Sequence, residues 1–133
     1  MRIGTAMGAL LALLSVVAAA RPAVAERRVA LVVGNGAYQN VGRLANAPRD
    51  GESMAALLAR LDFEVELLRD LGQRDLAQAL RRFSRRADGA DVALFFYAGH
   101  SVQANDVNYL LPVDAAPEQW KSGASLPSTS GRS

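Results

Sequence analysis

The chain has a single histidine, His100, and it follows an apolar segment that has the composition of a buried strand. The segment reads Asp91-Val92-Ala93-Leu94-Phe95-Phe96-Tyr97-Ala98 and is separated from the imidazole by Gly99. This position suits a catalytic base on the rim of a parallel sheet, because active sites gather at the carboxyl ends of such strands. The 133 residues contain no cysteine, so the usual nucleophilic partner of such a base is absent.

Other site chemistries find little support in the sequence. Gly34-Asn35-Gly36 follows a strand-like run, but Gln39 stands where a dinucleotide fingerprint needs its third glycine. No serine lies in a nucleophile elbow, and one histidine with scattered carboxylates does not make a metal site. We therefore expect neither a metal nor a cofactor.

The segments that must position His100 alternate between strand and helix patterns. Residues 28–34 and 91–100 are apolar without alternation, which indicates strands buried on both faces. Residues 63–68 alternate and predict a half-exposed edge strand, and helices are expected after Asn46 and over about 74–87. This order predicts an α/β fold, a three-layer α/β/α sandwich with a largely parallel sheet. Its carboxyl edge is expected at Gly34, Leu68 and His100.

The helix patterns predict particular contacts. Asn46 is expected to cap the first helix, with Pro48 in its first turn. The apolar stripe of that helix is expected to comprise Met54, Leu57, Leu58 and Leu61. Near the end of the second helix, four arginines favour a solvated face that complements the helix dipole, with an anion site as the alternative: Arg81, Arg82, Arg85 and Arg86.

The two ends of the chain differ from the region between them. Residues 1–25 combine a basic start, an apolar stretch and a small-residue cleavage pattern, which predict a signal peptide and an exported, periplasmic or extracellular protein. The alternative is an uncleaved membrane anchor. Without this segment the acidic and basic residues are equal in number, so charge gives no argument for nucleic-acid binding. Residues 101–113 predict a hairpin with its turn at Asn105-Asp106, and 116–133 a disordered tail.

Five segments together resemble the caspase/metacaspase family of cysteine peptidases, in particular its bacterial caspase-like domains. They are Arg28 to Asn35 with Tyr38, Leu44 with Asn46 to Asp50, Leu61 to Val65, Ala90 to His100, and Asn108 to Asp114. Their order and spacing match the family over about residues 27–115. The resemblance implies that 26–115 form a partial caspase-like domain, the N-terminal part of the catalytic large subunit.

The resemblance also assigns roles to individual residues. His100 matches the catalytic histidine, and the partner is then a peptide or protein substrate. Asp50 matches an acidic residue that, in metacaspase-like members, lines the pocket for a basic residue before the cleaved bond. An equally weighted interpretation of Asp50 is dipole stabilisation in the first turn of a helix. Ser101 stands where the family usually has a glycine whose backbone N–H helps to bind the oxyanion.

The family nucleophile is a cysteine in an Asp-x-Cys motif after the next core strand, and this chain has neither. Ser101 is not expected to replace it, because adjacent side chains of an extended chain point apart. We therefore expect a cysteine-type endopeptidase domain by resemblance that is inactive as this chain alone. The alternatives are a non-catalytic interaction module and a truncated gene product. A fold that stops after the third core strand is also expected to expose an apolar strand edge, which another chain could complement.

Overall fold

The computed structural model describes residues 24–116 and 118. Its elements are β1 (Arg28–Gly34), α2 (Ala47–Arg60), β2 (Phe63–Arg69), α3 (Gln73–Ala87), β3 (Val92–Ala98), β4 (Ser101–Ala104) and β5 (Val107–Leu110). The apolar stretch of the predicted signal peptide and nearly all of the predicted tail lie outside the described residues. Within the described residues, no helix is long and apolar enough to cross a membrane.

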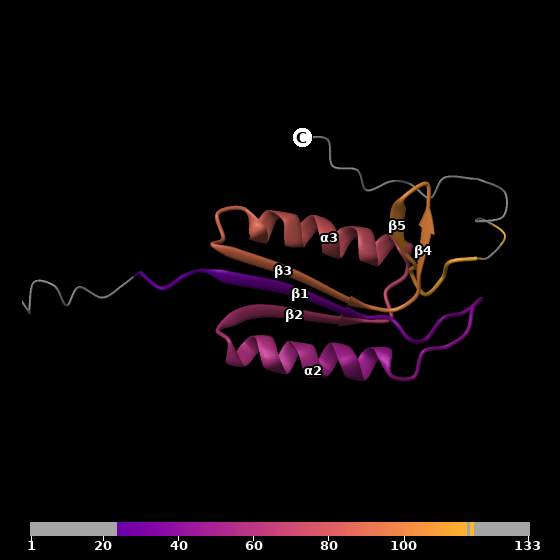
Figure 1. Cartoon of the computed structure of the whole chain (residues 1–133), viewed down its shortest axis with the longest axis horizontal. Coiled ribbons are helices and arrows are strands. Elements are labelled where there is room, and N and C mark those ends of the chain that lie inside the picture. The colour runs from indigo at the N-terminus through magenta and orange to yellow at the C-terminus, as the bar shows by residue number, and fades with distance from the viewer. Residues whose placement is uncertain (1–23, 117, 119–133) are drawn as a thin grey trace, which may run out of the picture.

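Three layers form the body of the molecule. The strands are parallel and lie in the order β2-β1-β3, while α2 covers one face of the sheet and α3 the other (Figure 1). β1 is the central strand, and its side chains from Val29 to Val33 are completely buried. Ala30 and Val32 pack toward α2, and Leu31 and Val33 toward α3. The predicted α/β/α sandwich is therefore confirmed.

Helix α2 differs from its predicted contacts. Asn46 occupies the N-cap position, but its backbone is helical and its side chain makes no capping hydrogen bond. Leu57 and Leu61 are 42% and 48% exposed, so the predicted stripe is only partly correct. The buried face is instead built mainly from small residues: Ala47, Gly51, Ala55 and Leu58. The start of the helix lies so close to the end of β1 that a Cβ on Gly34 would lie 2.7 Å from the carbonyl oxygen of Ala47.

The strand β2 forms one edge of the sheet, as its alternating sequence predicts. Phe63, Val65 and Leu67 pack toward α2. On the opposite face, Glu66 pairs with Arg82 of α3 at 3.0 Å and with Arg86 at 3.4 Å. Two of the four clustered arginines therefore contact the sheet, and Arg81 and Arg85 remain exposed. Ion pairs this close to solvent contribute little stability, but they place charge along the β2 edge.

The strand β3 is the other edge of the described sheet, and no strand of the described residues pairs with its outer side. The sequence predicts burial on both faces, yet Val92 and Phe95 are 38% and 37% exposed. The apolar strand therefore has the composition of a central strand and the exposure of an edge strand. Such an edge can accept a further strand, because its N–H and C=O groups lack a partner ladder.

The hairpin β4–β5 lies beyond the carboxyl edge of the sheet (Figure 1). Asn105 and Asp106 both have positive φ angles, as a two-residue hairpin turn of type I′ requires. A small second core joins the segment after the hairpin to the loop that follows β1; it comprises Tyr38, Leu111, Val113 and Ala115.

Asn35 connects the end of β3 with the segments that follow β1, β2 and β5. It is completely buried, and its backbone N–H donates to the carbonyl of Ala98 at 2.8 Å. Its side-chain oxygen accepts the N–H of Leu71 at 2.9 Å, and its side-chain nitrogen lies 3.5 Å from the carbonyl of Leu111. One amide side chain thus joins the segments that follow β1, β2 and β5.

We expect Asn35→Ala to lower the free energy of unfolding by about 1–3 kcal/mol, because it leaves the partly buried N–H of Leu71 without its partner. Urea denaturation followed by circular dichroism measures this change. Asn40→Ala is the matched control: its exposed side chain makes one bond of 3.4 Å, to the carbonyl of Ala115. The control should change stability by less than about 0.5 kcal/mol. Equal effects of the two substitutions would contradict the role given to Asn35.

Candidate active site

The loop between β1 and α2 forms one wall of the candidate site. It begins at Gly36, where a Cβ would collide with the carbonyl oxygen of Leu44, so only glycine lets the loop fold back on itself. The carboxylate of Asp70, which follows β2, accepts the N–H groups of Gly36 and Ala37 at 3.0 and 2.9 Å. The loop is therefore fixed at its base by two neighbouring strand ends.

His100 follows β3 at the predicted carboxyl edge and is half-buried. Its Nε2 lies 2.7 Å from the carbonyl oxygen of Gly42, in the loop between β1 and α2. A carbonyl oxygen only accepts hydrogen bonds, so this contact requires the proton on Nε2. In the neutral ring Nδ1 is then unprotonated and can accept a proton, as a general base must.

Two tyrosine hydroxyls surround the backbone of His100. The hydroxyl of Tyr38 accepts the backbone N–H of His100 at 2.8 Å, and its ring lies 4.7 Å from the imidazole at an interplanar angle of 59°. The hydroxyl of Tyr97 lies 3.0 Å from that of Tyr38 and donates toward the carbonyl of Leu111 at 2.7 Å. These contacts connect the backbone of His100 to the loop after β1, through Tyr38, and to the segment after the hairpin, through Leu111.

The ionisation of Tyr97 is strongly disfavoured by its surroundings. Burial raises the pKa of its hydroxyl far above the ordinary value of 10.0, and the hydrogen bond with Tyr38 raises it further. Tyr97 therefore remains a neutral donor over the whole physiological range of pH.

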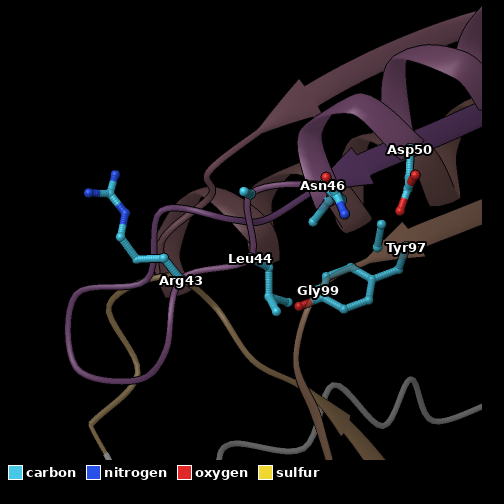
Figure 2. A pocket seen from close by; sticks show the side chains of 9 residues that line it. Arg43, Leu44, Asn46, Asp50, Tyr97 and Gly99 are labelled. Atoms are coloured by element: carbon cyan, nitrogen blue, oxygen red, sulfur yellow. The ribbon is translucent and has the colours of Figure 1, made fainter.

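Asp50 lies in the first turn of α2, on a cavity of about 400 Å³. The end of β3 lines the same cavity through Tyr97, Ala98 and Gly99, the residues directly before His100. Figure 2 shows the Asp50 carboxylate on the Tyr97 side of the cavity, while Arg43 extends away from it. Among the described residues no ion-pair partner is found for Asp50, whereas its neighbour Glu52 pairs with Arg69 at 2.7 Å. The structure thus places the two predicted site residues at one edge of the sheet.

Ser101 begins β4 and is exposed. The carbonyl of His100 accepts the N–H of Leu111 at 3.0 Å, so the next pair of the antiparallel ladder, Ser101 with Leu110, is one without mutual hydrogen bonds. The N–H of Ser101 consequently points away from β5. This orientation leaves it available to a ligand, which is the requirement for an oxyanion donor.

The groups that hold His100 in place, two tyrosine hydroxyls and the carbonyl of Gly42, could not be predicted from the sequence. Tyr38 and Tyr97 lie within the segments that carry the family resemblance, but no role could be given to them without knowing what they contact. Gly42 has no side chain that could mark its carbonyl as the partner of the imidazole. Within residues 24–116 and 118 there is also no cluster of three or more acidic, histidine or cysteine side chains that could hold a metal ion.

We expect the protein to lose stability as the pH rises above about 10, with Tyr97 as a main contributor. The unfolded chain releases the Tyr97 proton near 10.0, while the folded state retains it, so alkaline pH favours unfolding. The Tyr97→Phe variant should therefore lose less stability per pH unit, by about 1.4 kcal/mol, than the wild type. Urea denaturation between about pH 9 and 11.5 compares the two slopes, and identical slopes would contradict the burial of this hydroxyl.

Comparison with known proteins identifies the family of this arrangement. The family model described as the caspase domain matches residues 27–129, and so extends past residue 115. The mucosa-associated lymphoid tissue lymphoma translocation protein 1 of Homo sapiens and its Mus musculus homolog are each 32% identical to this chain over 99 residues. These matches cover 74% of this chain but only 12% of either relative. The chain therefore belongs to the caspase domain family, whose peptidases act on protein substrates.

Proposed function

We propose that this chain supplies the histidine half of a caspase-type cysteine endopeptidase site that cleaves after Arg or Lys. The observation that carries the proposal is the 2.7 Å contact between Nε2 of His100 and the carbonyl oxygen of Gly42. This contact orients the ring and leaves Nδ1 as the proton acceptor. A histidine held in this way resembles the base of a nucleophile–base pair in which a third group orients the base.

The chemistry follows from the two ring nitrogens. A thiol placed opposite Nδ1 transfers its proton to the imidazole, and the thiolate attacks the carbonyl carbon of the peptide bond. The imidazolium then returns the proton to the departing amine, and water hydrolyses the thioester that remains. The carbonyl of Gly42 stabilises the imidazolium through the Nε2–H bond, which is strengthened when the ring is charged. The outward N–H of Ser101 is a candidate donor to the oxyanion.

The thiol has to come from outside these 133 residues, because they include no cysteine. The open side of β3 is a suitable place for it to arrive. A strand added in parallel to β3 would end at the same edge of the sheet as His100, as β1 and β2 do. The exposed side chains of Val92 and Phe95 favour an apolar strand there. The same open edge would also serve a non-catalytic interaction module of caspase fold, for which the missing cysteine is the supporting observation.

Asp50 is the proposed specificity residue. Its carboxylate is exposed on the cavity that continues from the end of β3, and it has no ion-pair partner among the described residues. An Arg or Lys side chain entering the cavity would supply the missing partner through charge-assisted hydrogen bonds. The first-turn position adds a favourable interaction with the helix dipole, and the two roles do not exclude each other.

We expect the chain to bind an N-acetylated peptide that ends in argininamide more weakly after Asp50→Asn. The dissociation constant should rise about fivefold, the effect of losing one solvent-exposed charge pair. Titration of the isotopically labelled chain by NMR measures this constant. Glu52→Gln is the matched control. It removes the same charge two residues further along the helix, from a side chain that is already paired with Arg69. An equal loss in both variants would show that overall charge, and not Asp50, determines binding.

We expect the isolated chain to leave Arg and Lys peptides uncleaved. Co-expression with a caspase-domain fragment that carries the cysteine and its strand should produce cleavage of a fluorogenic Arg substrate. His100→Ala should remove that cleavage, since the base is lost, while Arg81→Ala on the exposed face of α3 should not. Cleavage that survives His100→Ala would refute the assigned base. A stable complex without any cleavage would favour the interaction module.

A further inference from the structure

We infer that Tyr38 is the positioning residue of His100, and that Tyr97 holds Tyr38 in place. The inference rests on the proposed role of His100 as a base, but its test reads the imidazole directly and does not require cleavage. Tyr38 is 4% exposed and contacts His100 twice, through its hydroxyl and through its ring. It touches none of the atoms that would react, so its effect on the chemistry passes through the histidine.

The backbone of His100 is held at both of its polar groups. Its N–H donates to the hydroxyl of Tyr38 at 2.8 Å, and its carbonyl accepts the N–H of Leu111 at 3.0 Å. The residue is thus held from both sides along the chain. Gly99 permits this approach, because a Cβ there would lie 2.7 Å from the hydroxyl of Tyr38 and about as close to that of Tyr97.

The acceptor of the imidazole, the carbonyl of Gly42, belongs to an exposed residue of the loop between β1 and α2. A Cβ added to Gly42 would meet no atom within 4 Å. This part of the loop is attached on both sides of Gly42: the N–H of Gln39 donates to the carbonyl of Val113 and that of Leu44 to the carbonyl of Gly36, both at 2.9 Å. Val41 and Leu44 also pack against the second core, which contains Tyr38. Tyr38 therefore contacts the imidazole and anchors the loop that presents the imidazole's acceptor. Removing its hydroxyl should loosen both sides of the 2.7 Å contact together.

The hydrogen bonds from His100 through the two tyrosines can form one continuous chain. One arrangement of protons uses every donor once: His100 N–H to Tyr38, Tyr38 O–H to Tyr97, and Tyr97 O–H to the carbonyl of Leu111. Donors in such a chain polarise one another, so that each bond is strengthened by the next. Because burial keeps Tyr97 protonated, the chain persists over the range of pH in which the imidazole titrates.

The test uses the full chain labelled with ¹⁵N at histidine, in which a single imidazole gives the signals. NMR reads which ring nitrogen carries the proton and how fast the Nε2–H exchanges with water. The wild type should show one tautomer, protonated on Nε2. Tyr38→Phe keeps the ring and removes the hydroxyl; it should give a mixture of tautomers and about tenfold faster exchange, the equivalent of one lost hydrogen bond.

Two controls separate positioning from general loss of stability. Tyr109→Phe alters the third tyrosine of the chain, on β5, and Leu58→Ala destabilises the core below the sheet. Both should leave the tautomer and the exchange rate as in the wild type. An unchanged imidazole in Tyr38→Phe, or the same change in Leu58→Ala, would overturn the inference.

If Tyr38→Phe does not fold, Tyr97→Phe provides the decisive measurement. It removes the hydroxyl that holds Tyr38, and it should raise the exchange rate about threefold, less than loss of the direct bond. No change in this variant would overturn the inference. The NMR test is also separate from the cleavage assay. An imidazole that is well positioned by NMR, in a complemented protein that does not cleave, would refute the peptidase proposal alone.

Discussion

The carbonyl oxygen of Leu111 is the acceptor on which the carboxyl edge of the sheet depends. Three donors point toward it: the side-chain amide of Asn35 at 3.5 Å, and the hydroxyls of Tyr38 and Tyr97 at 3.0 and 2.7 Å. The short bond from Tyr97 is the strongest, and the single O–H proton of Tyr38 is shared between this carbonyl and the hydroxyl of Tyr97, each 3.0 Å away. Because Leu111 is buried, no water replaces a donor that is lost. The end of β3 and the segments after β1 and β5 are therefore joined at one atom.

This arrangement explains why the hairpin matters to a site to which it contributes no reactive side chain. The peptide N–H of Leu111 binds the carbonyl of His100. The carbonyl of Leu111 accepts the hydroxyl of Tyr97 and lies 3.0 Å from that of Tyr38, which accepts the N–H of His100. The histidine is thus held by the segment that follows the hairpin as well as by its own strand. A base that must keep one ring nitrogen on a carbonyl and the other toward a substrate needs this kind of support, because small displacements cost large factors in rate.

The parts of this structure that follow from local pattern could be predicted, and those set by contact geometry could not. Apolar runs and helix signals gave the order of elements, and the rule for parallel sheets placed His100 at the carboxyl edge. Asp50 was named from the family resemblance, and only the fold brings it to the same edge. The predicted stripe of α2 was only partly correct, because the helix buries small residues with Leu58 and leaves Leu57 and Leu61 turned outward. The carbonyl of Gly42 was missed because every residue has a carbonyl, and only the fold decides which one meets the imidazole.

The two edges of the sheet differ in a way that bears on function. Along β2, Glu64 and Glu66 alternate with apolar residues and pair with Arg86 and Arg82, a charged pattern that discourages further strands. Along β3 no such charge is found within the strand, and apolar side chains are exposed beside the open ladder. His100 follows this open edge, and its tautomer is already fixed by Gly42. The proposed base is therefore oriented before any nucleophile arrives, and a strand added to β3 would bring its end to the side of the sheet where His100 lies.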